Sequence, residues 1–310
     1  MIKSLALTLG DPAGIGPELC LQILANNSDN IHVFGSSELL RRVAKATGFP
    51  FLENNIHDVP FPDAQKIHPG QLSAAAGAHS FACLEKAVEA TLAGDFSALV
   101  TNPINKEAWH LAGLPYPGHT EYLVEKTASP RHAMMLTAGE ITCSLVTTHI
   151  PLAQVAQKLT VERILEVIRL TADTMQRLRG RARLIMPGLN PHAGEGGLFG
   201  DEEIRLLTPA LAQARAEGIN IAGPLPPDTA FVPSLREKTD AYVCLYHDQG
   251  LIPLKTLAFD HAVNITLGLP IVRSSVDHGT AFDIAWQGKA SVRSLEEAVK
   301  LGRILAEKSA

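Results

Sequence analysis

The chain has 310 residues, of which 46% are hydrophobic and 19% are charged, and its formal net charge at pH 7 is −5. This is the composition of a globular protein that is long enough for a large core and two lobes. No basic tract alternates with aromatic residues and no apolar run reaches the roughly 18 residues of a membrane span, so we expect neither nucleic acid nor a membrane as a partner.

Apolar runs of strand length alternate with stretches of helical periodicity along the chain, which predicts an α/β fold with a largely parallel sheet. The segment 49–69, with four prolines, is expected to be irregular. Ser294 and Glu297 match a capping box at the start of the last helix. We expect strands at 5–9, 31–34, 98–101, 133–136, 142–147, 183–186, 219–222, 241–246 and 262–267, and helices at 17–25, 37–47, 74–92, 106–112, 120–127, 161–178, 202–217 and 295–308.

The four cysteines, at positions 20, 83, 143 and 244, form no C-x-x-C pair, and each lies in an apolar context. They are expected to be buried free thiols in a reducing compartment, and a zinc site built from cysteine is not expected. The apolar stretch near the amino terminus is broken by Gly10-Asp11-Pro12 and is too short for a signal-peptide core. We therefore expect a cytoplasmic protein.

Three histidines lie at or just after the ends of predicted strands: His149, His192 and His247. Open α/β sheets hold their sites at the carboxyl ends of their strands. Three neutral imidazoles would hold a divalent cation and leave positions open for substrate oxygens, although a lone histidine is more often structural. No H-E-x-x-H or facial-triad spacing is present, so spacing alone leaves both interpretations open. Imidazole ligands favour zinc, with magnesium, manganese and cobalt as alternatives.

Polar residues further along the chain suit an anion. Lys255, Asn264 and Arg273 border or follow apolar runs, and this trio fits a phosphate or a carboxylate. His119 and Thr120 open a predicted helix, whose N-terminus also favours an anion. Alternatively, Lys255 and Arg273 belong to a solvated basic surface.

Two glycine-containing loops have more than one interpretation. The segment 10–18, GDPAGIGPE, is either a phosphate loop or a tight turn between a strand and a helix, since it matches no nucleotide fingerprint. The segment 277–290 is predicted as a loop leading into a helix, and it would wrap the adenosine end of a cofactor or form a surface turn. The prolines at 224–227 predict a rigid turn before Asp228.

These motifs resemble one family nearly from end to end: 4-hydroxythreonine-4-phosphate dehydrogenase, an enzyme of pyridoxal phosphate biosynthesis. The opening GIGPE and the HGTAFDIA segment also resemble isocitrate and isopropylmalate dehydrogenases. The resemblance implies two α/β lobes with a cleft between them, no Rossmann fingerprint and a homodimer. It rests on GDPAGIGPE (10–18), TNPINK (101–106), GHTEYL (118–123), PGLNPHAGEGGLFGDEE (187–203), YHDQGLIPLK (246–255), NITLGLP (264–270) and SSVDHGTAFDIA (274–285).

The resemblance also implies roles for residues and lobes. The first lobe is expected at 1–125 with 275–310, and the second, with the dimer contacts, at 126–274. One of the three metal-binding histidines is expected from the partner subunit, so that the active site is shared across the interface. The implied roles are metal binding for His149, His192 and His247, substrate or phosphate binding for His119, Thr120, Lys255, Asn264 and Arg273, catalysis for Asp228 and Asp248, and cofactor binding for His278, Gly279, Thr280 and Ala281.

The implied reaction is the metal-dependent oxidation of 4-hydroxythreonine 4-phosphate by NAD or NADP, with decarboxylation of the product. Related enzymes would instead oxidise a tetronate 4-phosphate, either erythronate or threonate, or an aromatic cis-dihydrodiol. Two alternatives from other classes need no NAD: a metal-dependent lyase or hydrolase acting on a sugar phosphate, and a non-catalytic protein that binds a phosphorylated metabolite.

Overall fold

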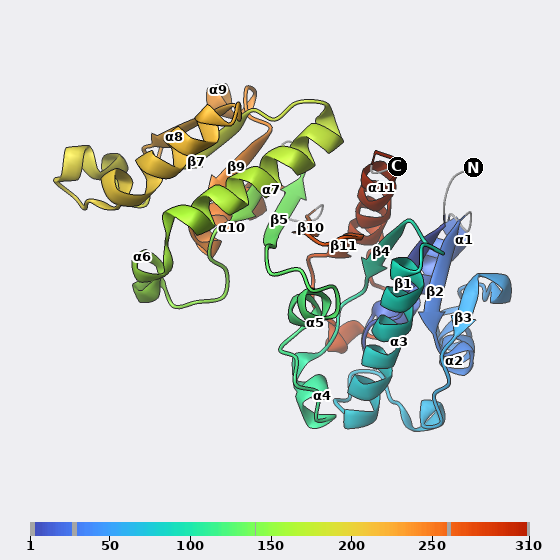
Figure 1. Cartoon of the computed structure of the whole chain (residues 1–310). Helices are drawn as coiled ribbons and strands as arrows, with labels where there is room; N and C mark the ends of the chain where they lie inside the picture. Colours follow the sequence, from blue (N-terminus) through green and yellow to red (C-terminus); the bar gives the residue numbers. More distant parts are fainter. Residues whose placement is uncertain (1–3, 27–29, 140, 259–261, 309–310) are drawn as a thin grey trace. The chain divides into compact units, whose positions relative to one another are not determined.

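The computed structural model describes residues 4–26, 30–139, 141–258 and 262–308. Figure 1 shows strands and helices alternating along the chain, which confirms the predicted α/β class. The described residues divide into two compact units, one made of residues 4–130 and 269–308 (unit 1) and the other of residues 131–268 (unit 2). Arg273, which was expected in the second lobe, therefore belongs to unit 1.

Unit 1 contains a parallel sheet whose strands stand in the order β3-β2-β1-β4-β11. Its central strand, β1, is buried over its whole length, as expected for a strand covered on both faces. The strands are β1 (Leu5–Thr8), β2 (Ile31–Gly35), β3 (Ile56–Asp58), β4 (Ala98–Thr101) and β11 (Val272–Val276).

Short polar residues define where several helices of unit 1 begin. The side chains of Ser36, Ser73 and Asn105 each accept a hydrogen bond from the backbone N–H three residues on, which satisfies a donor that the helix leaves free. Gly48 ends its helix in the left-handed conformation at φ 80°. The helices are α1 (Gly16–Asn26), α2 (Ser37–Thr47), α3 (Ala74–Leu92), α4 (Lys106–Leu111), α5 (His119–Lys126) and α11 (Arg293–Glu307).

Unit 2 contains a mixed sheet in the order β10-β5-β6-β9-β7-β8. The pairs β10–β5 and β5–β6 are antiparallel, whereas the pairs β6–β9, β9–β7 and β7–β8 are parallel. The prediction of a largely parallel sheet thus holds for unit 1 and for three of the five strand pairs of unit 2. The strands are β5 (Ala133–Ala138), β6 (Ile141–Leu145), β7 (Leu184–Pro187), β8 (Ile221–Leu225), β9 (Ala241–Cys244) and β10 (Val263–Leu267).

Helices α7 and α10 both pack against the sheet of unit 2, and Figure 1 shows α7 passing along its strands. Gly250 allows α10 to lie close to the sheet, because a Cβ there would come within 3.1 Å of both Cys143 and Cys244. The π-helical turn Glu203–Leu207 leads into α8. The α-helices are α6 (Val155–Lys158), α7 (Val161–Arg179), α8 (Thr208–Ala216), α9 (Pro233–Arg236) and α10 (His247–Ala258).

Four expectations about local structure need correction. Strand β3 lies inside the segment expected to be irregular, and β11 was not expected, since Arg273 interrupts its apolar pattern. Helix α10 was missed because Gly250 and Pro253 are poor helix formers, and packing on the sheet stabilises it instead. Ser294 is not a cap: α11 begins at Arg293, so Ser294 is buried inside its first turn.

The four cysteines are free and buried, as predicted. Burial raises the pKa of the Cys20 and Cys83 thiols, which keeps them protonated and unreactive at neutral pH. Within the described residues, no helix has the length and apolar character needed to cross a bilayer.

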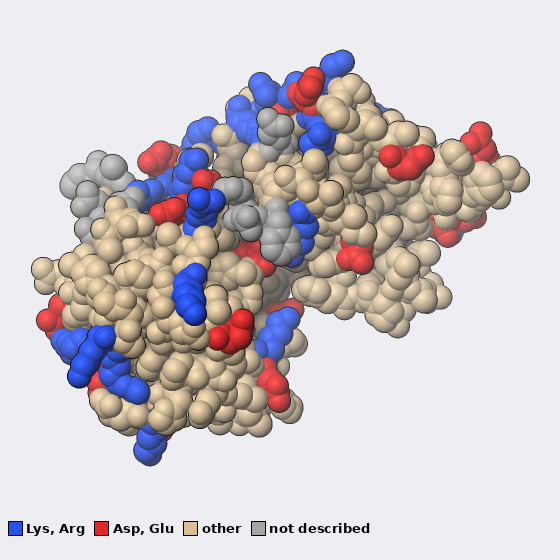
Figure 2. Space-filling view, turned by 180° about the vertical axis from the view of Figure 1, so that it is seen from behind, with Lys and Arg blue, Asp and Glu red and all other residues tan. Residues whose placement is uncertain are grey.

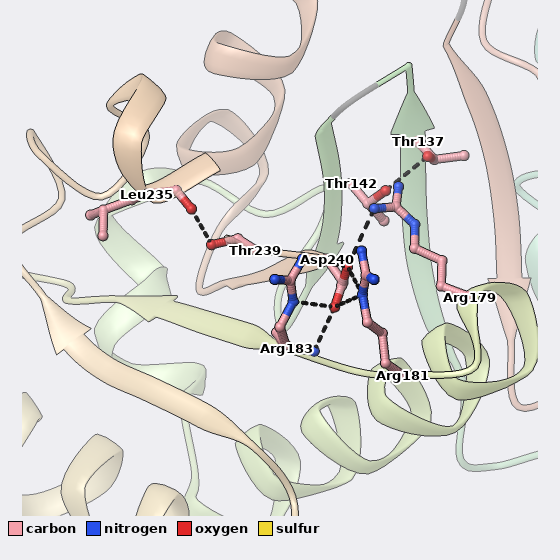
Figure 3. Close-up of polar contacts among 8 residues, drawn as sticks. All are labelled: Thr137, Thr142, Arg179, Arg181, Arg183, Leu235, Thr239 and Asp240. Atoms are coloured by element: carbon pink, nitrogen blue, oxygen red, sulfur yellow. Dashed lines mark hydrogen bonds and ion pairs between the residues drawn. The ribbon is translucent and has the colours of Figure 1, made fainter. Parts of the chain in front are cut away.

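A buried carboxylate joins the amino ends of β7 and β9 in unit 2 (Figure 3). Asp240, whose side chain is fully buried, accepts hydrogen bonds from Arg183 Nε at 2.9 Å and from Arg181 Nε at 3.1 Å, and Arg179 lies 3.5 Å away. Burial alone would raise the pKa of this carboxyl, but the hydrogen bonds from Arg183 and Arg181 lower it to about 2. The carboxylate is therefore charged at all pH values near neutrality.

Replacing Asp240 by asparagine is expected to lower the free energy of unfolding at pH 7 by about 2 kcal/mol, because the native state favours the charged carboxylate. A lowered native pKa stabilises the fold above the unfolded pKa of about 4, and this contribution disappears as the pH falls towards 2. Urea denaturation at pH 7 and at pH 3 to 4 measures both effects. The difference in free energy of unfolding between the wild type and Asp240→Asn should be smaller at the acidic pH.

The matched control is Asp173→Asn, because Asp173 is largely exposed and its ion pair with Arg177 measures 3.8 Å. This change should cost less than about 0.5 kcal/mol at either pH. Equal effects of the two substitutions would contradict the role given to Asp240.

Candidate active site

Two of the predicted metal-binding histidines come together at the carboxyl ends of neighbouring strands in unit 2. Strands β6 and β9 pair in parallel, and beyond their ends the Thr147 backbone N–H and hydroxyl both donate to the Leu245 carbonyl. The chain leaves the sheet two residues after Thr147, at His149, and two residues after Leu245, at His247. Their ring centroids lie 5.7 Å apart. The sheet register therefore brings these two imidazoles together.

The orientation of His247 is fixed by its neighbour in the sequence. His247 Nδ1 lies 2.6 Å from Asp248 Oδ1, so the nitrogen donates its hydrogen to the carboxylate. This arrangement leaves Nε2 with a free lone pair, the form in which imidazole binds a metal. His247 is half-buried, whereas His149 and Asp248 are exposed, so the pair is open to solvent.

Gln249, which the sequence analysis did not identify, holds this end of the sheet together. It is buried, its Oε1 accepts from the Leu245 N–H, and its Nε2 donates to the Gly188 carbonyl, both at 2.7 Å. These bonds join the ends of β9 and β7 to the first turn of α10, which carries His247. The only signal in the sequence was its place in the motif YHDQG.

His192 lies on a turn of the opposite hand to an ordinary helix. The backbone φ is positive at six consecutive residues, 192–197, of which three are not glycine: His192, Ala193 and Glu195. Each non-glycine residue in this conformation costs roughly 1–2 kcal/mol. Such strain persists only where surrounding contacts hold it, and it is most often found at functional sites.

Glu203 anchors the segment that leads into this turn. It is 3% exposed, and its carboxylate accepts hydrogen bonds from the backbone N–H groups of Leu189 and Asn190 and from the Asn190 side chain, at 2.7–2.9 Å. Glu202 accepts a further bond from the Asn190 side chain. Glu203 thus fixes the strand end from which the left-handed turn starts, and sequence inspection did not identify it.

The structure does not bring all three histidines together within one chain. Among the described residues, no group of three or more His, Cys, Asp or Glu side chains could hold a metal ion. The nearest recorded ring neighbour of His192 is Phe199, at 6.0 Å, and not His149 or His247. Of the three predicted metal-binding histidines, one chain therefore brings His149 and His247 together and leaves His192 exposed elsewhere.

Two cavities border the α10 end of unit 2. One, of about 390 Å³, is lined by His247, Asp248 and Lys255, and the other, of about 520 Å³, includes Asp228. Asp248 lines both. Asn264, on β10, has a buried Oδ1 with no hydrogen-bond partner among the described residues. An imidazole, a cation and two carboxylates thus line adjacent spaces, a combination that suits a charged, hydroxylated substrate.

Unit 1 holds the remaining predicted anion-binding residues. Arg273, on β11, is 3% exposed, and its Nη2 donates to Thr101 Oγ1 on the adjacent strand β4 at 2.7 Å. Burial lowers the pKa of Arg273 to about 10, against the opposing effect of Glu121, so the guanidinium is charged at pH 7.

His119 and Thr120 form the first turn of α5. Burial first, and then Arg273 and Lys106, lower the pKa of His119 well below its usual value, so its ring is neutral at pH 7. His119 Nε2 is shielded from solvent and has no hydrogen-bond partner among the described residues. His119 and Arg273 therefore lie close enough in unit 1 to interact electrostatically.

The two glycine-containing loops of unit 1 are packed together. The Ile15 N–H donates to the Thr280 carbonyl at 3.0 Å, and Trp286 Nε1 donates to the Pro12 carbonyl at 3.1 Å. A Cβ on Gly14 would come within 2.8 Å of the Thr280 carbonyl oxygen, so this approach requires glycine. The segment after Thr280 forms the 3₁₀ turn Phe282–Ile284 and a loop that leads into α11, as predicted.

The expected cofactor segment 278–281 has room for a ligand. A Cβ on Gly279 would meet nothing within 4 Å, and Ala281 is held at φ 42°. His278 Nδ1 contacts the Gly279 carbonyl at 3.0 Å, and its Nε2 is buried without a hydrogen-bond partner among the described residues. These features are compatible with a group that binds along the loop.

The chain is similar to known proteins over nearly its whole length. The sequence model of the family "Pyridoxal phosphate biosynthetic protein PdxA" matches residues 27–302. The chain is 43% identical to the D-threonate 4-phosphate dehydrogenase of Salmonella typhimurium, over 98% of the chain and 99% of the relative. It is 44% identical to the 4-hydroxythreonine-4-phosphate dehydrogenase of Marinobacter nauticus, over 98% and 95% respectively.

Solved structures give the same result. The crystal structure of 4-hydroxythreonine-4-phosphate dehydrogenase from Klebsiella pneumoniae superposes with a TM-score of 0.90 at 43% identity, covering 99% of this chain and 98% of that one. A β-decarboxylating dehydrogenase from Thermococcus kodakarensis matches with a TM-score of 0.52 at 14% identity, covering 98% of this chain and 81% of that one. The second likeness concerns the fold alone, and it agrees with the predicted isocitrate dehydrogenase-like architecture.

Proposed function

Because the chain belongs to the PdxA family of pyridoxal phosphate biosynthetic proteins and is an oxidoreductase of the dehydrogenase type, we propose that it oxidises 4-hydroxythreonine 4-phosphate. The proposed oxidant is NAD or NADP, a divalent metal ion is required, and the β-keto acid product loses carbon dioxide. The proposed working form is a cytoplasmic homodimer. Neither nucleic acid nor a membrane is a proposed partner, and Figure 2 supports this with basic and acidic side chains interspersed on the face it shows.

One observation carries the proposal: His149 and His247 emerge side by side from neighbouring strand ends, with Asp248 on Nδ1 of His247. These residues fit a divalent metal, because imidazole nitrogens are its preferred ligands and Asp248 leaves Nε2 of His247 free to bind. His192 of the partner subunit would complete the set. When bound, the metal would lower the pKa of the substrate hydroxyl, zinc being the first candidate and magnesium, manganese or cobalt the alternatives.

The acidic residues have the proton-transfer role in this proposal. Asp228 and Asp248 are exposed carboxylates on adjacent cavities of unit 2, so they can take the hydroxyl proton directly or through one water. Asp248 would then also hold the His247 ring in place. Loss of this proton would favour departure of hydride from the same carbon, and the nicotinamide, when bound, would accept it.

The remaining predicted residues bind the rest of the substrate and the cofactor. We assign Lys255 and Asn264 of unit 2, and His119, Thr120 and Arg273 of unit 1, to the phosphate and the polar groups of the substrate. Fixing a distant phosphate uses its binding energy to position the reacting carbon. Residues 278–281 are assigned to the dinucleotide, a role that the open space at Gly279 supports.

D-threonate 4-phosphate is the second candidate substrate, because the relatives at 42–44% identity carry either name. The two acids differ by an amino or a hydroxyl group beside the carboxylate. Erythronate 4-phosphate and an aromatic cis-dihydrodiol are more distant candidates.

The test is the formation of reduced nicotinamide with a panel of 4-hydroxythreonine 4-phosphate, D-threonate 4-phosphate, erythronate 4-phosphate and a cis-dihydrodiol. We expect the highest kcat/KM with the first, loss of activity with a chelator, and recovery with a divalent metal. Faster turnover of a tetronate phosphate would transfer the proposal to that substrate. If none of these substrates leads to reduced nicotinamide, the remaining candidates are a lyase, a hydrolase or a binding protein.

A further inference from the structure

Two histidines of unit 1 face each other at the edge of its sheet, and the proposed reaction uses neither. His32 lies on β2 and His57 on the edge strand β3. Figure 1 shows these two strands side by side. The parallel register pairs His57 with Phe34. Because side chains alternate along a strand, His32 and Phe34 share one face, and His57 joins them there.

Aromatic neighbours fix the orientation of both imidazoles. The His57 ring stacks on Phe34 with centroids 4.7 Å apart and planes inclined by 11°, and it meets the edge of Phe96 at 5.4 Å. His32 also contacts Phe96, at 5.5 Å. Phe34 and Phe96 are both buried, so the two rings rest on a rigid base and are not free surface side chains.

The ring nitrogens are spaced as a pair of metal ligands would be. His57 Nε2 lies 3.1 Å from His32 Nδ1. Two nitrogens that bind one metal at about 2.0–2.1 Å, with an angle between right-angled and tetrahedral, stand about 2.9–3.4 Å apart. The same distance also fits an N–H···N hydrogen bond, so the experiment must separate the two arrangements.

The facing nitrogens of the pair are accessible from solvent. Burial first, and then the neighbouring His57, lower the pKa of His32, because two protonated imidazoles this close would repel each other. His57 is exposed and His32 is half-buried, so an ion could reach the facing nitrogens from solvent.

We propose that His32 and His57 form a second metal site, distinct from the proposed catalytic ligands, for a divalent transition ion that prefers imidazole: Cu²⁺, Ni²⁺ or Zn²⁺. The described residues offer no third His, Cys, Asp or Glu ligand to such a group, so water completes the coordination and the ion exchanges with solvent. Copper binds tightest, following the general order of affinities for nitrogen ligands. An ion at this site fastens the edge strand β3 to β2.

The test counts bound ions per chain in the full-length protein after removal of metal with a chelator. Equilibrium dialysis against Ni²⁺ or Cu²⁺ is carried out on the wild type, on His57→Asn and His32→Asn, and on two controls. His68→Asn removes an exposed imidazole of the same unit, and His149→Asn removes a proposed catalytic ligand. Electron paramagnetic resonance of the Cu²⁺ form reports the number of bound nitrogens.

We expect His57→Asn and His32→Asn each to bind one ion fewer than the wild type, and His68→Asn to bind the full number. In His149→Asn, a copper signal with two imidazole nitrogens should persist. The melting temperature should rise with added ion more in the wild type than in His57→Asn, whose exposed position leaves folding intact. The proposal would be overturned if the wild type and His57→Asn bound the same number of ions with the same affinity. It would also be overturned if His32 and His57 shared an N–H···N proton that added metal did not displace.

Discussion

Replacing His192 by alanine is expected to abolish turnover, lowering kcat by about 10³-fold or more, and to weaken metal binding in the same protein. The reason is that a pair of imidazoles, His149 and His247, is too few to hold a catalytic metal that must keep open positions for substrate. Steady-state kinetics with saturating metal, together with metal analysis after gel filtration, measure both effects. His110→Ala, which removes another exposed histidine, is the control and should retain full activity.

A mixing experiment tests where His192 acts. If it completes the site of the partner subunit, His192→Ala and His247→Ala proteins are both inactive, yet a heterodimer of the two has one intact site. Statistical re-association of equal amounts should then recover about a quarter of the wild-type activity, because half of the dimers are mixed and each has one working site. No recovery after verified subunit exchange would contradict a shared site, and full activity of His192→Ala alone would remove this residue from the mechanism.

Replacing Arg273 by methionine is expected to lower kcat/KM for the phosphorylated substrate by about 10²- to 10³-fold, mainly through KM, because a buried charged donor to an anion is worth several kcal/mol. Arg273 is 3% exposed and tied to Thr101, so its guanidinium is already oriented before substrate arrives. Steady-state kinetics measure the change in KM. Competition by inorganic phosphate measures the change in the affinity of the substrate site for an anion.

Two variants make the Arg273 result specific. Arg273→Lys keeps a positive charge but loses the planar fork, so it should recover only part of the affinity. Thr101→Val removes the hydroxyl that orients the guanidinium and should have a smaller effect of the same kind. An unaltered KM in folded Arg273→Met, with folding checked by circular dichroism, would refute the assignment.

The sequence predicted most elements of the fold because they are apolar and locally regular. Helices α2 and α3 have the predicted bounds, since serine caps and apolar periodicity agree. Strand β11 could not be predicted in the same way, since Arg273, Ser274 and Ser275 are polar and become buried only because partners exist elsewhere. Ser274 donates to the Ala298 carbonyl of α11, a contact far along the chain.

The same limit applies to the site. Residues at strand ends could be expected to cluster, and His149 and His247 do. The groups that orient them could not be found, because Gln249 and Glu203 act through backbone groups of distant segments that no local pattern identifies. The absence of His192 from that pair also depends on tertiary geometry, which the spacing of histidines does not reveal.

The left-handed turn that carries His192 has a consequence for the order of events during folding. An isolated peptide of this sequence would not wind in that direction, because Ala193 and Glu195 disfavour it. The hydrogen bonds from the Leu189 and Asn190 N–H groups to Glu203 hold the segment just before the turn at the end of β7. We infer that the segment presenting His192 is among the last parts of unit 2 to form, and that hydrogen exchange there reports the earliest opening of the native state.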